Sequence, residues 1–239
     1  MAGYKVKLGS TAAAKGVAID EGLRQYMLRV YNYMSTGLAI TGLVAFFTAN
    51  SPALLNAIFG TPLAWVVILA PLGIVFYLSA RMHKMSPAKA QAAFWIFAAL
   101  MGLSLSLLVI TYTGASIARV FFITAGTFGA MSLYGYTTKR DLTAWRSFLV
   151  MGLIGVLIGL VVNAFFIQSQ LMDYVISVIG VIVFVGFTAY DTQKIKNTYD
   201  AVSHDGTLMT KSAIMGALKL YLDFLNLFIF LMHLLGVRR

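Results

Sequence analysis

Residues 187–196 read FTAYDTQKIK, and this stretch decides how the rest of the sequence is interpreted. It ends a run, residues 174–190, that contains no charged side chain, and it places Asp191 directly after that run. A second stretch, LYLDFLNLF at residues 220–228, sets Asp223 at the start of another apolar run. The other six of the eight acidic residues fall in the N-terminal segment, at helix ends or in loops. Because an ionisable side chain inside a hydrophobic helix is costly, both aspartates are predicted to be functional.

Composition places the chain among membrane proteins. Its 239 residues are 60% hydrophobic and 11% charged, with a mean hydropathy of +0.84, whereas soluble domains contain about 25% charged residues. The net charge of +10 does not indicate a nucleic-acid partner, because the basic residues are spread between hydrophobic runs rather than gathered in one patch. The lack of cysteine excludes disulfides, thiolate metal sites and cysteine nucleophiles.

Seven hydrophobic segments are long enough to cross a bilayer, which takes about 20 residues of helix. The predicted spans are residues 29–49, 62–82, 90–112, 115–136, 145–167, 174–195 and 213–236. No connection between them could form a soluble domain, so the sequence predicts an all-α, polytopic seven-helix bundle over residues 25–239. Residues 1–24 are expected to form a polar cytoplasmic tail, which lacks the apolar core of a cleavable signal peptide.

Lysine and arginine residues predict the orientation. They occur in the N-terminal segment and in the second, fourth and sixth connections, whereas the first, third and fifth connections contain none. The positive-inside rule therefore places the N-terminus and the even-numbered connections in the cytoplasm. Seven spans put the C-terminus on the opposite side of the membrane. A last helix that enters and returns, leaving both ends inside, is the alternative.

Small residues recur at helical spacing inside three of the predicted spans. Such residues let helices approach closely where no hydrophobic effect drives their association. They are Gly102, Ser104 and Ser106 in the third span, Gly126, Gly129 and Ala130 in the fourth, and Gly152, Gly155 and Gly159 in the fifth. We expect all of them to support tight packing within the bundle.

The two aspartates are predicted to lie at a similar depth. Asp191 precedes Lys196 by five residues, and Asp223 follows Lys219 by four. At a rise of about 1.5 Å per residue, each carboxylate is roughly 6–8 Å along its helix from a lysine at the cytoplasmic end. Arg81, at the cytoplasmic end of the second span, is expected at the same level. Two acids and an arginine at one depth can form a cluster that closes a pathway.

The chemistry of such a cluster follows from crowding. Two carboxylates at contact distance cannot both ionise cheaply, so one retains a proton and the pair titrates as a unit. A nearby arginine favours the ionised form. The pair can therefore respond to pH near neutrality, and its ionised oxygens are ligands suited to Ca²⁺.

Several simpler or different readings stay open at this point. Asp223 and Lys219 are four residues apart and could form an ordinary ion pair, and Asp191 could be an interfacial residue beside a basic loop. Intramembrane aspartyl proteases carry a YD motif, which residues 190–191 match, and a GxGD motif, which residues 220–223 do not match. No proline follows the second aspartate, and no histidines have metal-site spacing, so neither enzymatic activity nor a resident cofactor is expected.

Three stretches resemble the Bax inhibitor-1 (transmembrane Bax inhibitor motif) family, and the bacterial members most closely. Residues 132–142, SLYGYTTKRDL, resemble the junction of its fourth and fifth helices. Residues 186–195, GFTAYDTQKI, resemble its sixth-helix signature, and residues 220–228 resemble its last helix. The resemblance covers roughly residues 24–236, with the three motifs in the order that the family has.

The resemblance implies a fold and an activity. The family fold is a seven-helix bundle whose last helix is enclosed by the other six. Bacterial members are described as pH-sensitive Ca²⁺ leak channels whose gate includes two aspartates. These correspond to Asp191 and Asp223, which would also hold Ca²⁺ transiently. An arginine of the second helix that joins the aspartates in the closed state corresponds to Arg81.

The sequence therefore supports two hypotheses. The first is a passive Ca²⁺ leak in a bacterial inner membrane, gated by protonation of the aspartate pair with Arg81 as counter-charge and Ca²⁺ as the transported ion. The second is a non-conducting adaptor that binds a membrane-bound protease or other membrane proteins. The resemblance implies that role as well, because other members are linked to membrane protein quality control and to the suppression of cell death. The expected partners are the lipid bilayer, Ca²⁺ and such membrane proteins.

Overall fold

A computed structural model describes the backbone of residues 9–239 and the side chains of residues 21–239 except His83. The part of the chain that it describes is helical, apart from short turns and loops and one isolated bridge between Tyr112 and Arg238. The elements are α1 (Gly9–Ala49), α2 (Pro52–Phe59), α3 (Leu63–Arg81), η1 (Met82–Lys84), α4 (Pro87–Thr111), α5 (Gly114–Thr137), α6 (Trp145–Val162), η2 (Asn163–Ile167), α7 (Gln170–Val202) and α8 (Gly206–Leu235).

Seven of these helical segments are long and apolar enough to cross a membrane, which confirms the predicted all-α polytopic fold. Their ends differ from the prediction, because several helices continue into polar sequence. Helix α7 runs to Val202, and α8 already begins at Gly206, where Asp205 accepts hydrogen bonds from the backbone N–H groups of Thr207 and Leu208. Helix α1 includes Gly9, so no helix end marks the proposed boundary between residues 24 and 25. That boundary stays a prediction.

Helix α2 was not predicted from the sequence. Ser51 caps it by accepting a hydrogen bond from the backbone N–H of Leu54, and Pro52 occupies its first turn, where a missing N–H costs nothing. The helix has only eight residues, so it is too short to span a bilayer and forms part of the connection between α1 and α3.

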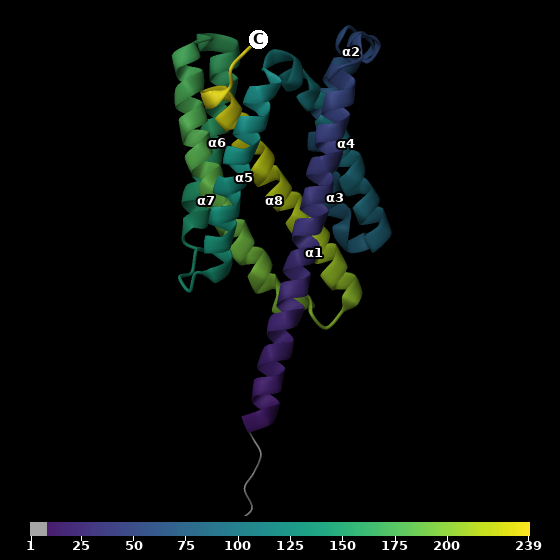
Figure 1. The fold of residues 1–239 in the computed structure, drawn as a ribbon, viewed down its shortest axis with the longest axis vertical. Coiled ribbons are helices and arrows are strands. Elements are labelled where there is room, and N and C mark those ends of the chain that lie inside the picture. The colour runs from purple at the N-terminus through teal and green to yellow at the C-terminus, as the bar shows by residue number, and fades with distance from the viewer. Residues whose placement is uncertain (1–8) are drawn as a thin grey trace, which may run out of the picture.

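The last helix lies at the centre of the bundle, as predicted. In its most apolar stretch 72% of residues are buried, against 11–39% in the other six spans. It contacts α1, α4, α5 and α7 along its length, and Figure 1 shows it crossing diagonally between them. Leu220, Tyr221 and Leu227 are fully buried. Burial of this degree explains why the helix is apolar on nearly every side, and it makes the polar residues of α8 unusual.

Helix α8 crosses the bundle completely. It is continuous over 30 residues, and the residues after it are held at the α4–α5 turn. There the N–H of Thr113 donates to the carbonyl of Val237 at 3.0 Å, and the N–H of Arg239 donates to the carbonyl of Thr111 at 3.0 Å. The C-terminus and the start of α1 lie at opposite ends of the bundle (Figure 1). The structure therefore has no returning last helix.

The predicted packing role of the small residues is right for some positions and wrong for others. A Cβ on Gly102 would meet Val44 of α1 at 2.7 Å, and a Cβ on Gly152 would meet Val183 of α7 at 2.7 Å. Cβ atoms placed on three others, Gly126, Gly129 and Gly155, would have no atom within 4 Å. Gly126 and Gly155 are exposed, and Gly129 lines an open groove of about 540 Å³ between α1 and α5. Their small size is not explained by contacts within the chain.

Candidate functional site

Asp191 and Asp223 line one open-sided cavity between helices of the bundle, together with Lys219 and Asn226. This aspartate cavity has a volume of about 410 Å³ and lies between α3, α4, α6, α7 and α8. Its remaining walls are apolar: Pro71, Leu72, Val75, Phe97, Met101, Leu153, Leu157, Phe184, Phe187, Leu222 and Leu225. The two aspartates that were predicted to share one depth are therefore brought to one space, by two helices that are joined only through the short turn after Val202.

The polar groups that α8 contributes form one helical stripe. Lys219, Leu222, Asp223 and Asn226 follow the spacing i, i+3, i+4 and i+7, which places them on a single face of the helix. Asn226 donates its amide N–H to the carbonyl of Leu222 at 2.8 Å, so it is bound to its own helix rather than to an aspartate. Among the described residues, no side chain of this stripe donates a hydrogen bond to the carboxylate of Asp223.

Asp223 is the most deeply placed acid. Its side chain is only 5% exposed, and its Oδ2 atom has no hydrogen-bond partner among the described residues. A buried polar atom without a partner costs free energy, and a charged one costs far more. Such a group persists where it has a function or where an ion, proton or water satisfies it. Asp191 is less enclosed and lies one helix away on α7.

Lys219 is the cation that accompanies the aspartates in the cavity. The sequence raised it only as an ion-pair partner of Asp223. In the described residues, however, no lysine nitrogen lies within 4.0 Å of either carboxylate. Its charge still interacts electrostatically with both aspartates, and the two aspartates interact with each other. Lys219 and Asp223 therefore share one polar cavity, but they do not form a direct ion pair.

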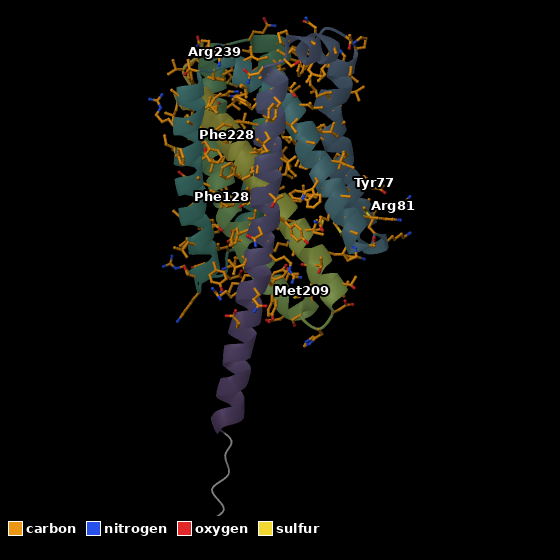
Figure 2. All side chains as sticks on the ribbon, turned by 45° about the vertical axis from the view of Figure 1, so that its right-hand side comes forward. Tyr77, Arg81, Phe128, Met209, Phe228 and Arg239 are labelled. Carbon is orange, nitrogen blue, oxygen red and sulfur yellow. The ribbon has the colours of Figure 1, made fainter. Side chains whose placement is uncertain are left out.

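The structure does not bring Arg81 to the aspartates. Its side chain is exposed and extends away from the bundle at the end of α3 (Figure 2), and it does not line the aspartate cavity. The reason is positional: Arg81 is the last residue of α3, a helix that packs chiefly on α4 at the edge of the bundle. In this conformation the prediction of a three-membered cluster with Arg81 is not met, and a role for Arg81 in another state stays a prediction.

The residues after Asp191 hold the connection between α5 and α6. The side-chain oxygen of Gln193 accepts from the backbone N–H of Leu142 at 2.8 Å, and its amide donates to the carbonyl of Arg140 at 2.8 Å. The ammonium of Lys196 donates to the carbonyl of Tyr136 at 2.8 Å. We call these three contacts the α7 clasp. The sequence did not predict it, although a glutamine at the end of an apolar span is itself a signal of a specific partner.

Close backbone approach completes the support of Asp191. A Cβ on Gly135 of α5 would overlap the backbone of Ala189, two residues before the aspartate. Ser132, one turn earlier, hydrogen-bonds the hydroxyl of Thr192 at 2.9 Å. Two of the stretches that carried the family resemblance, residues 132–142 and 186–195, therefore pack against each other. Within these two stretches, Phe187 and Asp191 are the residues that line the cavity.

No group of three or more histidine, aspartate or glutamate side chains is arranged to hold a metal ion in the part of the chain that the structure describes. Tight Ca²⁺ sites use six to eight oxygen ligands. The aspartate cavity supplies two carboxylates, so it fits a passing cation better than a resident one.

A bundle of seven spanning helices, in which the last helix lies at the centre and two aspartates line one cavity, defines a polytopic membrane protein with an intramembrane acid pair. The sequence profile of the family described as "Inhibitor of apoptosis-promoting Bax1" matches residues 23–239. The chain belongs to this family, the Bax inhibitor-1 family, which confirms the resemblance seen in the sequence.

Relatives in several bacteria match nearly the whole chain. It is 48% identical over 229 residues to an uncharacterized protein of Rickettsia prowazekii, covering 96% of each chain. It is 47% identical over 220 residues to the inner membrane protein YbhL of Escherichia coli K12, covering 91% of this chain and 94% of YbhL. A protein of Caulobacter vibrioides is 40% identical over 232 residues, covering 93% of this chain and 92% of that protein.

Proposed function

We propose that this protein is a pH-sensitive Ca²⁺ leak of a bacterial inner membrane, gated by protonation of Asp191 and Asp223. The observation that carries the proposal is the aspartate cavity, where carboxylates from α7 and α8 share one space and Oδ2 of Asp223 has no partner among the described residues. When both are ionised, the carboxylates attract a cation and repel each other. When one is protonated, that attraction falls, and the two helices can approach. The role requires no catalytic step and no resident cofactor.

The proposed orientation follows from charge and fold. Lysines and arginines concentrate at the N-terminal end and in the even-numbered connections, which points to a cytoplasmic N-terminus. The C-terminus lies at the opposite end of the bundle (Figure 1), which places it on the other side of the membrane. An inner-membrane location is in keeping with the name of the relative YbhL.

Purified protein in liposomes tests the leak directly. We expect Ca²⁺ influx that changes between about pH 6 and 8. The Asp191→Asn and Asp223→Asn variants should lose this pH response, because neither can release the shared proton. Asp141→Asn is the matched control: Asp141 is exposed in the α5–α6 connection, where hydrogen bonds from Thr143 lower the pKa of its carboxyl group.

The outcomes of this experiment separate the gating claim from the leak. A pH response that survives in both aspartate variants contradicts gating by the pair. Absence of flux at every pH contradicts the leak as a whole. Loss of the response in Asp141→Asn as well would show that the change of charge, rather than its place in the cavity, is responsible.

A non-conducting adaptor is the second candidate, and the open glycines of α5 favour it. Gly126 and Gly129 have no neighbour within 4 Å of a Cβ position, so this side of α5 could receive a helix of another membrane protein, such as a membrane-bound protease. This role predicts co-purification of a partner that survives loss of both aspartates, together with no flux from the pure protein.

A further inference from the structure

The aspartate cavity contains a cation that belongs to the protein itself. Lys219 lines the cavity one helical turn before Asp223 and on the same face of α8. It is partly buried, and its nitrogen forms no contact within 4.0 Å with the carboxylate oxygens of Asp191 or Asp223. Its ammonium ends a flexible four-carbon stem, so it can move relative to the fixed carboxylates.

The other elements around the cavity add no further charge. Helices α3, α4 and α6 contribute only apolar side chains to its walls, and α7 contributes Asp191. Lys194, also on α7, acts on Asp191 electrostatically but is exposed and lies over the ring of Tyr190 at 5.7 Å, outside the cavity. With both carboxylates ionised and the ammonium charged, the cavity carries two negative charges and one positive charge, a net charge of −1.

We infer that the Lys219 ammonium is a built-in competitor for divalent cations at the aspartate cavity. A net charge of −1 is neutralised by one proton or one monovalent ion, whereas Ca²⁺ would leave an excess positive charge next to the ammonium. Ca²⁺ therefore binds well only when the side chain of Lys219 swings away. The lysine favours the empty or protonated cavity and keeps any bound Ca²⁺ short-lived, which suits a leak rather than a store.

This inference deepens the proposed function, and it is tested by binding rather than by flux. The measurement is the Ca²⁺ concentration that gives half of the maximal Ca²⁺-induced rise in the unfolding temperature of the purified full chain in detergent at pH 7.5, since a bound ion stabilises the folded state. The variants are Lys219→Met and Lys219→Gln, with Lys219→Arg as the charge-conserving variant. Lys84→Met is the matched control, because Lys84 is an exposed lysine of η1 outside the cavity.

We expect the half-maximal Ca²⁺ concentration to fall about tenfold or more in Lys219→Met and Lys219→Gln, because a repulsive charge beside the ion has been removed. Lys219→Arg and Lys84→Met should stay within about twofold of the unmodified chain. Asp223→Asn should abolish the Ca²⁺ response.

Two results would overturn the inference. One is an unchanged half-maximal concentration in both neutral Lys219 variants while Asp223→Asn still abolishes the response, since the cavity would then bind Ca²⁺ without competition. The other is the lack of any Ca²⁺ response in every variant. If the expected shifts occur but liposomes show no flux, the leak is wrong and the competing lysine stands.

Discussion

Two cavities flank the central helix, and they differ in chemistry more than in size. The aspartate cavity of about 410 Å³ faces Lys219, Asp223 and Asn226 of α8. A second cavity of about 580 Å³, which we call the apolar cavity, faces Phe224 and Phe228 of the same helix and lies between α1, α4, α5 and α8. Figure 2 labels Phe228 and Arg239, two of its lining residues, on the side of the bundle near α1 and α5.

The difference in polar lining indicates which of the two cavities is the candidate for function. The apolar cavity is the larger, yet its polar lining is limited to Thr41, Asn50 and Arg239, and it contains no carboxylate. Lipid chains are as apolar as its walls, so filling it costs little. The aspartate cavity cannot be filled that way, because its carboxylates require protons, ions or water. The smaller cavity is therefore the functional candidate.

Because the two faces of α8 differ in this way, we predict that a new carboxylate is tolerated on the face toward the aspartate cavity but not on the face toward the apolar cavity. Phe228→Asp would place an acid in the apolar cavity, where the described wall offers no nearby cation except Arg239 at its end. We expect the free energy of unfolding in detergent to fall by about 3 kcal/mol, the cost of an aspartate at the centre of a spanning helix.

Asn226→Asp is the comparison variant for Phe228→Asp. It introduces the same group on the same helix, but in the cavity that already contains Lys219. Its cost should be less than half as large, and Phe228→Leu, which removes volume without charge, should cost about 1 kcal/mol. Equal destabilisation by both new aspartates would show that the two sides of α8 do not differ in the way described.

Helix α5 offers a second contrast, between glycines that are packed and glycines that are open. Gly135 lies directly on the backbone of Ala189, two residues before Asp191, whereas Gly129 has nothing within 4 Å of a Cβ position. A backbone cannot move aside as a flexible side chain can. Gly135→Ala should therefore destabilise the protein by about 2 kcal/mol and shift α7 away from α5.

Gly129→Ala is the matched control for that substitution. It should leave stability unchanged or raise it by about 0.5 kcal/mol, because alanine has the better helix propensity. Thermal unfolding of both variants in the same detergent measures the difference. Destabilisation by Gly129→Ala instead would indicate that this surface is packed against another subunit or a tightly held partner.

The sequence predicted the framework of the molecule because hydrophobicity determines it. The number of spans follows from apolar length, and the shared depth of Asp191 and Asp223 follows from their spacing to the flanking lysines, since a carboxylate is costly in lipid. The central position of the last helix was implied by the family resemblance rather than by hydrophobicity. The polar stripe of α8 was also readable, since residues 219, 223 and 226 share one face at helical spacing.

The sequence did not reveal which neighbour each side chain meets. Arg81 was expected at the depth of the aspartates, but depth fixes neither rotation about a helix nor position across the bundle, and α3 packs chiefly on α4. The glycines of α5 look alike in the sequence, yet Gly135 packs on a backbone, whereas Gly126 and Gly129 have no atom within 4 Å of a Cβ position. Gln193 finds its partners in a connection about fifty residues earlier, a contact that local pattern cannot predict.

The α7 clasp gives the smallest effect that we predict. Gln193→Ala removes two hydrogen bonds to the α5–α6 connection and leaves the N–H of Leu142 without its acceptor. Leu142 is buried, whereas Arg140 is exposed, so water can replace only the bond to the Arg140 carbonyl, and we expect a decrease of about 1 kcal/mol in the free energy of unfolding. Asn197→Ala, at an exposed position one turn later, should change stability by less than about 0.5 kcal/mol.

The Gln193→Ala variant also tests whether the aspartate cavity depends on how α7 is held. If Gln193 only fastens a loop, its loss lowers stability and leaves the pH response of Ca²⁺ flux unchanged. We expect a change in both, because Gln193 lies two residues after Asp191 on the same helix, and a looser α7 lets that carboxylate move relative to Asp223. The pH profile of flux should therefore become broader, or its midpoint should shift, in Gln193→Ala but not in Asn197→Ala. An unchanged profile would confine the clasp to stability and leave the position of Asp191 to its packing against α5.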